Sequence, residues 1–119
     1  MNRLGRKGED LAVDHLEGLG YTILERNVRL SQGELDAVAR DKETIVFVEV
    51  KARSGEGYGA PQEAVDRAKQ SRLTRLAREW LQLHGQEDAP ARFDVVSVLV
   101  DRSGRPGIRV FKNAFEASE

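Results

Sequence analysis

Three charged side chains between Gly33 and Arg53 could together hydrolyse a phosphodiester. Asp36 and Glu49 are acids within this stretch, and Lys51 comes two residues after Glu49. Two carboxylates, completed by water and substrate phosphate, are a common way for a protein to hold Mg²⁺. A lysine beside them can orient a water nucleophile and offset the charge that develops on the phosphate. The residue types therefore indicate metal-assisted phosphodiester hydrolysis.

A β-hairpin must position these side chains. Two runs rich in β-branched and apolar residues, Leu35–Ala39 and Thr44–Val50, flank a short polar segment, which is typical of two strands joined by a turn. Side chains alternate between the faces of a strand, so Leu35 is expected on the face of Ala37 and Ala39, opposite Asp36.

The expected register opposes like charges. Pairing the residues that flank the turn, and continuing along both strands, sets Asp36 directly across from Glu49. Such a pair is destabilising unless a cation lies between the acids. The same register sets Glu34 across from Lys51, so Glu34 is expected to hold that ammonium in place.

A family resemblance rests on these residues and on others along the chain. Asp36 followed by Glu49-Val50-Lys51 resembles the PD-(D/E)xK signature of restriction-endonuclease-like nucleases, with Leu35 where the generic signature has a proline. Further motifs, in order over nearly the whole chain, resemble the bacterial YraN-like proteins, which are relatives of archaeal Holliday-junction resolvases. The motifs are Gly8-Glu9, Arg26-Asn27, Gly33-Glu34-Leu35-Asp36, Val48-Glu49-Val50-Lys51, Lys69-Gln70, Arg92-Phe93-Asp94 and Asn113-Ala114-Phe115.

The resemblance implies an α/β fold with a restriction-endonuclease-like core. It implies Mg²⁺ or Mn²⁺ as cofactor, held by Asp36 and Glu49, with Glu9 as an auxiliary metal or water ligand. It implies DNA as the partner, with branched and single-stranded DNA as candidate substrates. The analogy with the resolvases also suggests a homodimer.

The first half of the chain predicts a helix and a strand. Apolar residues at helical spacing predict a helix from about Arg3 to Leu19, with Glu9 at the border between core and solvent. A strand is expected over Tyr21–Leu30. Its alternation groups one set of residues on a single face, namely Tyr21, Ile23, Glu25, Asn27 and Arg29.

Polar residues near the end of this first strand are candidate contacts to nucleic acid. Arg26, Asn27 and Arg29 could contact phosphate, although charges at a strand end are as often simply solvated. Arg53 shares the face of Lys51 and is a further candidate.

A glycine-rich segment and a second helix follow the hairpin. Ser54–Gly59 predicts a loop in which Tyr58 could stack on a base. Asp66 is a good N-cap for a helix that runs to about Leu83. Lys69 falls on the apolar stripe of this helix, where its charge needs a partner, so we expect it beside the active face of the hairpin. By resemblance, Lys69 and Gln70 are also candidate contacts to nucleic acid.

The last part of the chain predicts two more strands. Arg92–Val100 is a near-continuous apolar run, which is typical of a strand covered on both faces. A turn over Asp101–Gly107 leads to a last strand over Ile108–Phe111. The prediction is one domain over residues 1–119, with a mixed sheet of about five strands flanked by helices.

Composition excludes several classes of protein. The chain has 119 residues, 39% of them hydrophobic and 33% charged, which fits one globular domain. No cysteine is present, which excludes disulfides and thiolate zinc sites, and two histidines make no histidine cluster. The net charge of −1 argues against non-specific coating of nucleic acid. No secretory signal and no membrane-spanning apolar run are visible, so a cytoplasmic protein without a membrane partner is expected.

Three functions remain open from the sequence. The leading one is a metal-dependent nuclease. A catalytically inactive module that binds nucleic acid on the same scaffold is the second. In the third, the acids and Lys51 form only an exposed charge cluster on a hairpin.

Overall fold

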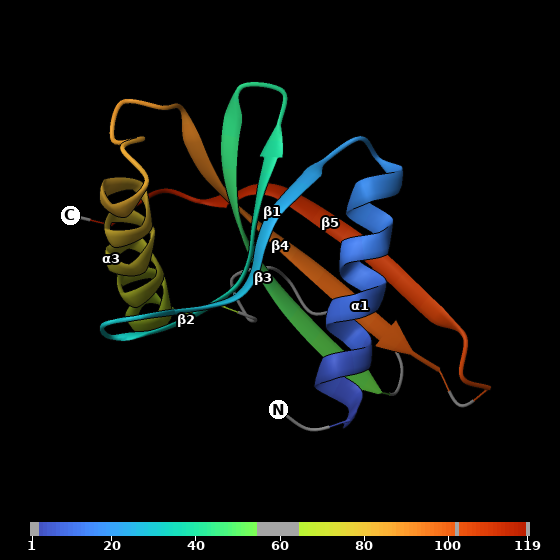
Figure 1. Ribbon diagram of the computed structural model, residues 1–119. Helices are drawn as coiled ribbons and strands as arrows, with labels where there is room; N and C mark the ends of the chain where they lie inside the picture. Colours follow the sequence, from blue (N-terminus) through green and yellow to red (C-terminus); the bar gives the residue numbers. More distant parts are fainter. Residues whose placement is uncertain (1–2, 55–64, 102, 119) are drawn as a thin grey trace.

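The computed structural model of the protein describes residues 3–54, 65–101 and 103–118. Its elements follow the predicted order of a helix, three strands, a helix and two strands (Figure 1). They are α1 (Arg3–Gly18), β1 (Thr22–Leu30), β2 (Gly33–Asp41), β3 (Thr44–Ser54), α3 (Arg67–Leu83), β4 (Ala91–Val100) and β5 (Pro106–Phe115).

The strands form a single five-stranded sheet in the order β1-β2-β3-β4-β5. Neighbouring strands are antiparallel except for β3 and β4, which are parallel and are joined through α3. Parallel neighbours need such a long crossover, because a tight turn can join only antiparallel strands. The predicted α/β architecture with a mixed sheet is confirmed.

Two apolar cores lie on opposite faces of the sheet, one under each helix (Figure 1). Large side chains fill the core under α3, including Phe47, Trp80 and Phe93. The core under α1 holds smaller residues, among them Ala12, Ala37, Ala39, Val46 and Val48. Because the middle of β3 and β4 is buried on both faces, the near-continuous apolar runs of these strands are explained.

The predicted ends of both helices are confirmed. Gly20 has φ +100° and its N–H donates to the Glu17 carbonyl at 3.0 Å, while Tyr21 N–H donates to Leu16 at 3.0 Å. This pair of bonds is the Schellman pattern that turns the chain out of α1 into β1. At α3, the Asp66 side chain accepts the N–H of Lys69 at 2.9 Å and caps the helix.

The predicted single face of the first strand is wrong. A bulge separates Ile23, which packs in the core under α1, from Glu25, which accepts the Trp80 Nε1–H at 2.9 Å on the α3 side. Asn27 adopts φ 52°, in the left-handed region, and this further breaks the alternation. Alternation holds only while the backbone remains extended, so it fails along β1.

The predicted face of Leu35 is also wrong. Leu35 packs in the core under α3, whereas Ala37, two residues along β2, packs under α1. Its pairing partner Val28 likewise packs under α3. In β1 and β2, the alternation of side chains between the two faces of the sheet is therefore interrupted at Asn27 and at Asp36. Asn27 is the residue of β1 in the left-handed region.

The last strand is longer than predicted, because β5 continues past Phe111 to Phe115. Asn113 takes φ 50° and its N–H donates to Asp94 Oδ1 at 3.0 Å, which keeps the polar end of β5 attached to β4. Phe115 then stacks on Phe93 with ring centroids 4.6 Å apart. Among the described residues, neither helix is long and apolar enough to cross a membrane.

Candidate active site

The hairpin of β2 and β3 has the predicted register over its paired part. The ladder runs from Asp41 opposite Thr44 to Ala37 opposite Val48 and stops there. The expected opposition of Asp36 with Glu49, and of Glu34 with Lys51, therefore falls just beyond the paired residues. Asp36 instead turns a carboxylate oxygen to β3, where Oδ2 accepts the backbone N–H of Val50 at 2.8 Å.

Asp36 lies in an environment that resists its ionisation. Burial, and next the negative charge of Glu49, raise the pKa of Asp36 from 3.8 to about 7. The charge of Glu9 acts in the same direction, while the Val50 hydrogen bond and the charge of Lys69 oppose it. Since nearby charges act strongly only over short distances, three acids and a lysine gather at this end of the hairpin.

Glu49 and Lys69 form the central contact of the site. The Lys69 ammonium lies 2.5 Å from Glu49 Oε1, and both side chains are largely buried, with 25% and 9% of their surfaces exposed. The expected position of Lys69 beside the active face is therefore confirmed. The cap at Asp66 fixes the first turn of α3, so the helix start delivers Lys69 to β3.

Glu9 comes from α1 and is more deeply placed than predicted. Only 4% of Glu9 is exposed, although a border position was expected, and burial raises the pKa of its carboxyl. Gly8 permits this depth, because a Cβ there would lie 2.5 Å from Cβ of Ala52 on β3. The close approach of α1 to β3 therefore brings Glu9 toward Asp36.

Asn27 links two of the acids. When its side-chain amide nitrogen faces the carboxylates, Asn27 donates to Oε1 of Glu9 at 3.0 Å and to Oε1 of Glu34 at 3.2 Å. This contact of Glu34 differs from the expected one with Lys51. The backbone of Asn27 is in the left-handed region, which asparagine adopts more readily than most residues.

Lys51 and Arg53 lie on the predicted face of β3. The parallel ladder with β4 runs without a register shift from Ile45 to Ser54, so alternation is preserved along this strand. Glu49, Lys51 and Arg53 therefore share one face, and Lys51 and Arg53 are both half-buried.

Two of the other expected contacts to nucleic acid, Arg26 and Gln70, already have partners within the protein. Arg26 is engaged by Asp10 at 2.6 Å, and the Gln70 amide donates to the Val65 carbonyl at 3.0 Å. Arg29 is exposed on β1 and lines a hollow with Glu34 and neighbouring residues. Tyr58 lies outside the described residues.

The donor set fits a hard cation held by few protein ligands. Within the described ranges, no group of three or more His, Cys, Asp or Glu side chains converges closely enough to hold a metal by itself. Asp36 and Glu49 remain as two carboxylates whose joint ionisation is unfavourable without a cation. Two carboxylates with water and phosphate are a set that Mg²⁺ accepts.

A buried polar network toward the hairpin turn was not predicted as a group. Asp94, with no exposed surface, accepts hydrogen bonds from Tyr21 Oη at 2.8 Å and Arg92 Nε at 2.9 Å. Arg92 also donates to Asp41 at 2.8 Å. A signal was present in the sequence, because Arg92 and Asp94 share one strand face inside an apolar run. Among the described residues, no buried side-chain nitrogen or oxygen lacks a hydrogen-bond partner. We therefore interpret this network as structural, since it links Arg92 and Asp94 of β4 to Asp41 of β2.

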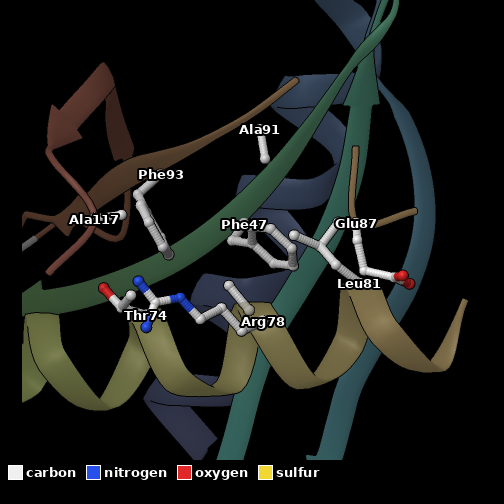
Figure 2. A pocket seen from close by; sticks show the side chains of 9 residues that line it. Phe47, Thr74, Arg78, Leu81, Glu87, Ala91, Phe93 and Ala117 are labelled. Carbon is white, nitrogen blue, oxygen red and sulfur yellow. The ribbon is translucent and has the colours of Figure 1, made fainter. Parts of the chain in front are cut away.

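A second hollow lies between the sheet and α3, and it is apolar. Phe47 and Phe93 point from the sheet toward Thr74 and Leu81 of the helix (Figure 2). The volume is about 250 Å³. Arg78 lies at this hollow and donates to the carbonyl of Ser118 at 3.1 Å, which attaches the C-terminal residues to α3. No acid pair faces this space among its lining residues, so the candidate chemistry stays with the acids near Glu49.

Comparison with known proteins places the chain among bacterial relatives. Residues 8–98 match the sequence model of the Uncharacterised protein family UPF0102. A UPF0102 protein of Clavibacter michiganensis is 52% identical, covering 93% of this chain and 94% of that protein. One of Symbiobacterium thermophilum is 50% identical, covering 97% and 98%, and one of Geobacter metallireducens is 54% identical, covering 95% and 92%.

Among solved structures, SfsA of Pyrococcus furiosus in complex with Ca²⁺ matches at a TM-score of 0.43 and 17% identity. The match covers 89% of this chain and 61% of SfsA, so the chain spans less than two thirds of that protein.

Proposed function

The chain belongs to the Uncharacterised protein family UPF0102, and we propose that it is a Mg²⁺- or Mn²⁺-dependent nuclease that hydrolyses phosphodiester bonds in DNA. One observation carries the proposal: Asp36 and Glu49 are brought together at the end of the β2–β3 ladder, in surroundings that disfavour two negative charges. A fold that retains this cost gains from it only when a cation binds.

Asp36 and Glu49 are the proposed metal ligands. A divalent cation held there would polarise the scissile phosphate and lower the pKa of a bound water. Val50 N–H, which donates to Asp36 Oδ2, leaves the other carboxylate oxygen for such a ligand and fixes its orientation. Glu9, held by Asn27, is proposed to orient water next to Asp36.

Lys51 is the proposed water-orienting and charge-offsetting residue. It shares the face of Glu49 on a strand whose pairing with β4 is regular, so the sheet fixes its backbone position. An ammonium that is already in place when charge develops on the phosphate costs no reorganisation at that moment. Arg53 extends the same face and is proposed to contact the DNA backbone, as are Arg29 and Gln70.

A cleavage and binding assay tests the proposal. Plasmid, single-stranded and four-way-junction DNA are incubated with Mn²⁺ and the wild-type protein, with Glu49→Gln and with the surface variant Arg67→Met. We expect wild type and Arg67→Met to cleave alike and Glu49→Gln to lose about 10² or more in rate. A mobility shift without cleavage by the wild type on all three substrates would instead assign an inactive binding module.

A further inference from the structure

Lys69 contacts Glu49, one of the two proposed metal ligands. Its ammonium is 2.5 Å from Glu49 Oε1, and its charge also lowers the pKa of Asp36, so it acts on both carboxylates. With three quarters of the Lys69 side chain buried, water screens this attraction poorly. In the protein without metal, Lys69 therefore supplies a positive charge to Glu49, while the pKa of Asp36 remains raised.

We propose that Lys69 is a displaceable counterion, which neutralises Glu49 in the metal-free protein and leaves it when a divalent cation binds. This inference rests on the proposed metal site. Once displaced, the ammonium lies beside the site with no carboxylate of its own, and a phosphate of the DNA is the partner of matching charge.

The Lys69 ammonium and a divalent metal ion cannot both bind the same oxygen of Glu49. Mg²⁺ requires carboxylate oxygens at about 2.0–2.1 Å in near-octahedral geometry, and an ammonium on the same oxygen would repel it. A lysine can yield because its charge is carried on a flexible four-carbon stem. The backbone of Lys69 is held by the Asp66 cap, so the side chain alone has to move.

Moving the Lys69 ammonium away from Glu49 costs free energy, so the wild type should bind metal more weakly than a variant without this ammonium. A site that is open in only a fraction of molecules binds with an apparent Kd raised by the inverse of that fraction. Removing the ammonium while keeping the apolar stem, as in Lys69→Met, should therefore tighten metal binding. The same variant should cleave DNA more slowly, since it lacks a phosphate contact. Loss of an ordinary structural residue would weaken both metal binding and cleavage. Tighter metal binding combined with slower cleavage therefore distinguishes the proposed role of Lys69.

Calorimetric titration with Mn²⁺, without DNA, tests the inference on wild type, Lys69→Met and Arg67→Met. Arg67 is an exposed residue of the same helix turn, so its variant controls for loss of one nearby positive charge. We expect the Kd of Lys69→Met to fall by about tenfold or more and that of Arg67→Met to change by less than about twofold.

Each outcome of the titration has a distinct meaning. Equal or weaker Mn²⁺ binding by Lys69→Met overturns the counterion role while the metal site stands. Absence of Mn²⁺ binding in all three proteins overturns both the inference and the proposed function.

A second measurement uses the wild type alone, in case Lys69→Met does not fold. Acetylation of Lys69 and of the exposed Lys42 is followed by peptide mass spectrometry with and without saturating Mn²⁺. We expect Mn²⁺ to accelerate modification of Lys69 by about tenfold and to leave Lys42 unchanged. An unchanged rate at Lys69, under conditions where Mn²⁺ binding is measured, overturns the inference.

Discussion

Replacing Asp36 by asparagine should stabilise the metal-free protein. Asparagine retains a carbonyl oxygen that can accept the Val50 N–H, which Asp36 accepts at 2.8 Å, and its amide nitrogen can donate to a neighbouring carboxylate. The substitution therefore keeps the local hydrogen bond and removes the repulsion with Glu49 and Glu9. A residue retained for metal binding is expected to reduce stability in this way.

The size of the effect follows from the pKa of Asp36. Ionising a carboxyl whose pKa is about 7 in the folded protein and 3.8 otherwise costs at most about 4 kcal/mol at neutral pH or above. Movement of Lys69 and of water toward the new charge recovers part of this cost, so about 1–3 kcal/mol is expected. For a domain of this size, that corresponds to a rise in Tm of about 3–10 °C.

The effect should depend on pH. Because the folded-state pKa of Asp36 is raised, the unfolded chain loses this proton first as pH increases. The contribution of the carboxyl to stability is therefore fully present below about pH 4 and is lost between about pH 4 and 7. Wild type should lose stability over this range by about 1–3 kcal/mol more than Asp36→Asn does.

Thermal unfolding in EDTA at about pH 5 and about pH 8 measures both effects. Asp10→Asn is the matched control, because Asp10 is an exposed acid of α1 whose ion pair with Arg26 should contribute at most about 1 kcal/mol. Adding Mg²⁺ at a hundredfold excess over Kd should stabilise wild type by about 2.7 kcal/mol and Asp36→Asn much less. A lower Tm of Asp36→Asn than of wild type in EDTA, with wild type insensitive to Mg²⁺, would refute the reasoning.

Three further outcomes are expected from other parts of the fold. Lys51→Ala should bind DNA within a few-fold of wild type and cleave about 10² times more slowly, and equal losses in a mobility-shift and a cleavage assay would make Lys51 an ordinary phosphate anchor. Gly8→Ala should lower the free energy of unfolding in urea by about 1–3 kcal/mol, because its Cβ would lie 2.5 Å from that of Ala52, and an unchanged midpoint would contradict the close packing. Asp94→Ala should cost about 3–5 kcal/mol in the same assay, since the partly buried Arg92 guanidinium loses its main partner, whereas a loss under about 1 kcal/mol would show that Arg92 is satisfied by water.

Much of the fold could be predicted because its signals are local. Alternating apolar residues with a polar turn predict the β2–β3 hairpin and its register, which the structure has from Asp41 to Ala37. Lys69 could be placed because a charge on an apolar helical stripe needs a partner, and Glu49 is that partner. Both inferences require only the regular geometry of one element and elementary electrostatics.

Prediction failed where the backbone leaves regular geometry. Asn27 adopts φ 52° within β1, and on the neighbouring strand Leu35 packs under α3 instead of sharing the face of Ala37. Asparagine tolerates this conformation better than most residues, but its presence in a strand does not require it. Asn27 is also the residue that contacts Glu34, where a contact between Glu34 and Lys51 was expected.

The convergence of the acids depends on contacts between elements distant in the sequence. Because the ladder stops at Ala37 and Val48, β2 and β3 end their pairing just before Asp36 and Glu49. At that end, Gly8 allows α1 to approach β3 closely enough for Glu9 to act on Asp36, while α3 supplies Lys69 to Glu49. Asp36, Glu49 and Lys69 are visible in the sequence as charges in unusual places, yet the distances among the acids and Lys69 are set by helix packing on opposite faces. The surroundings of the acid pair are therefore a property of the tertiary structure, because two separate helices contribute to them. For this reason metal affinity should depend on Lys69 as well as on the carboxylates themselves.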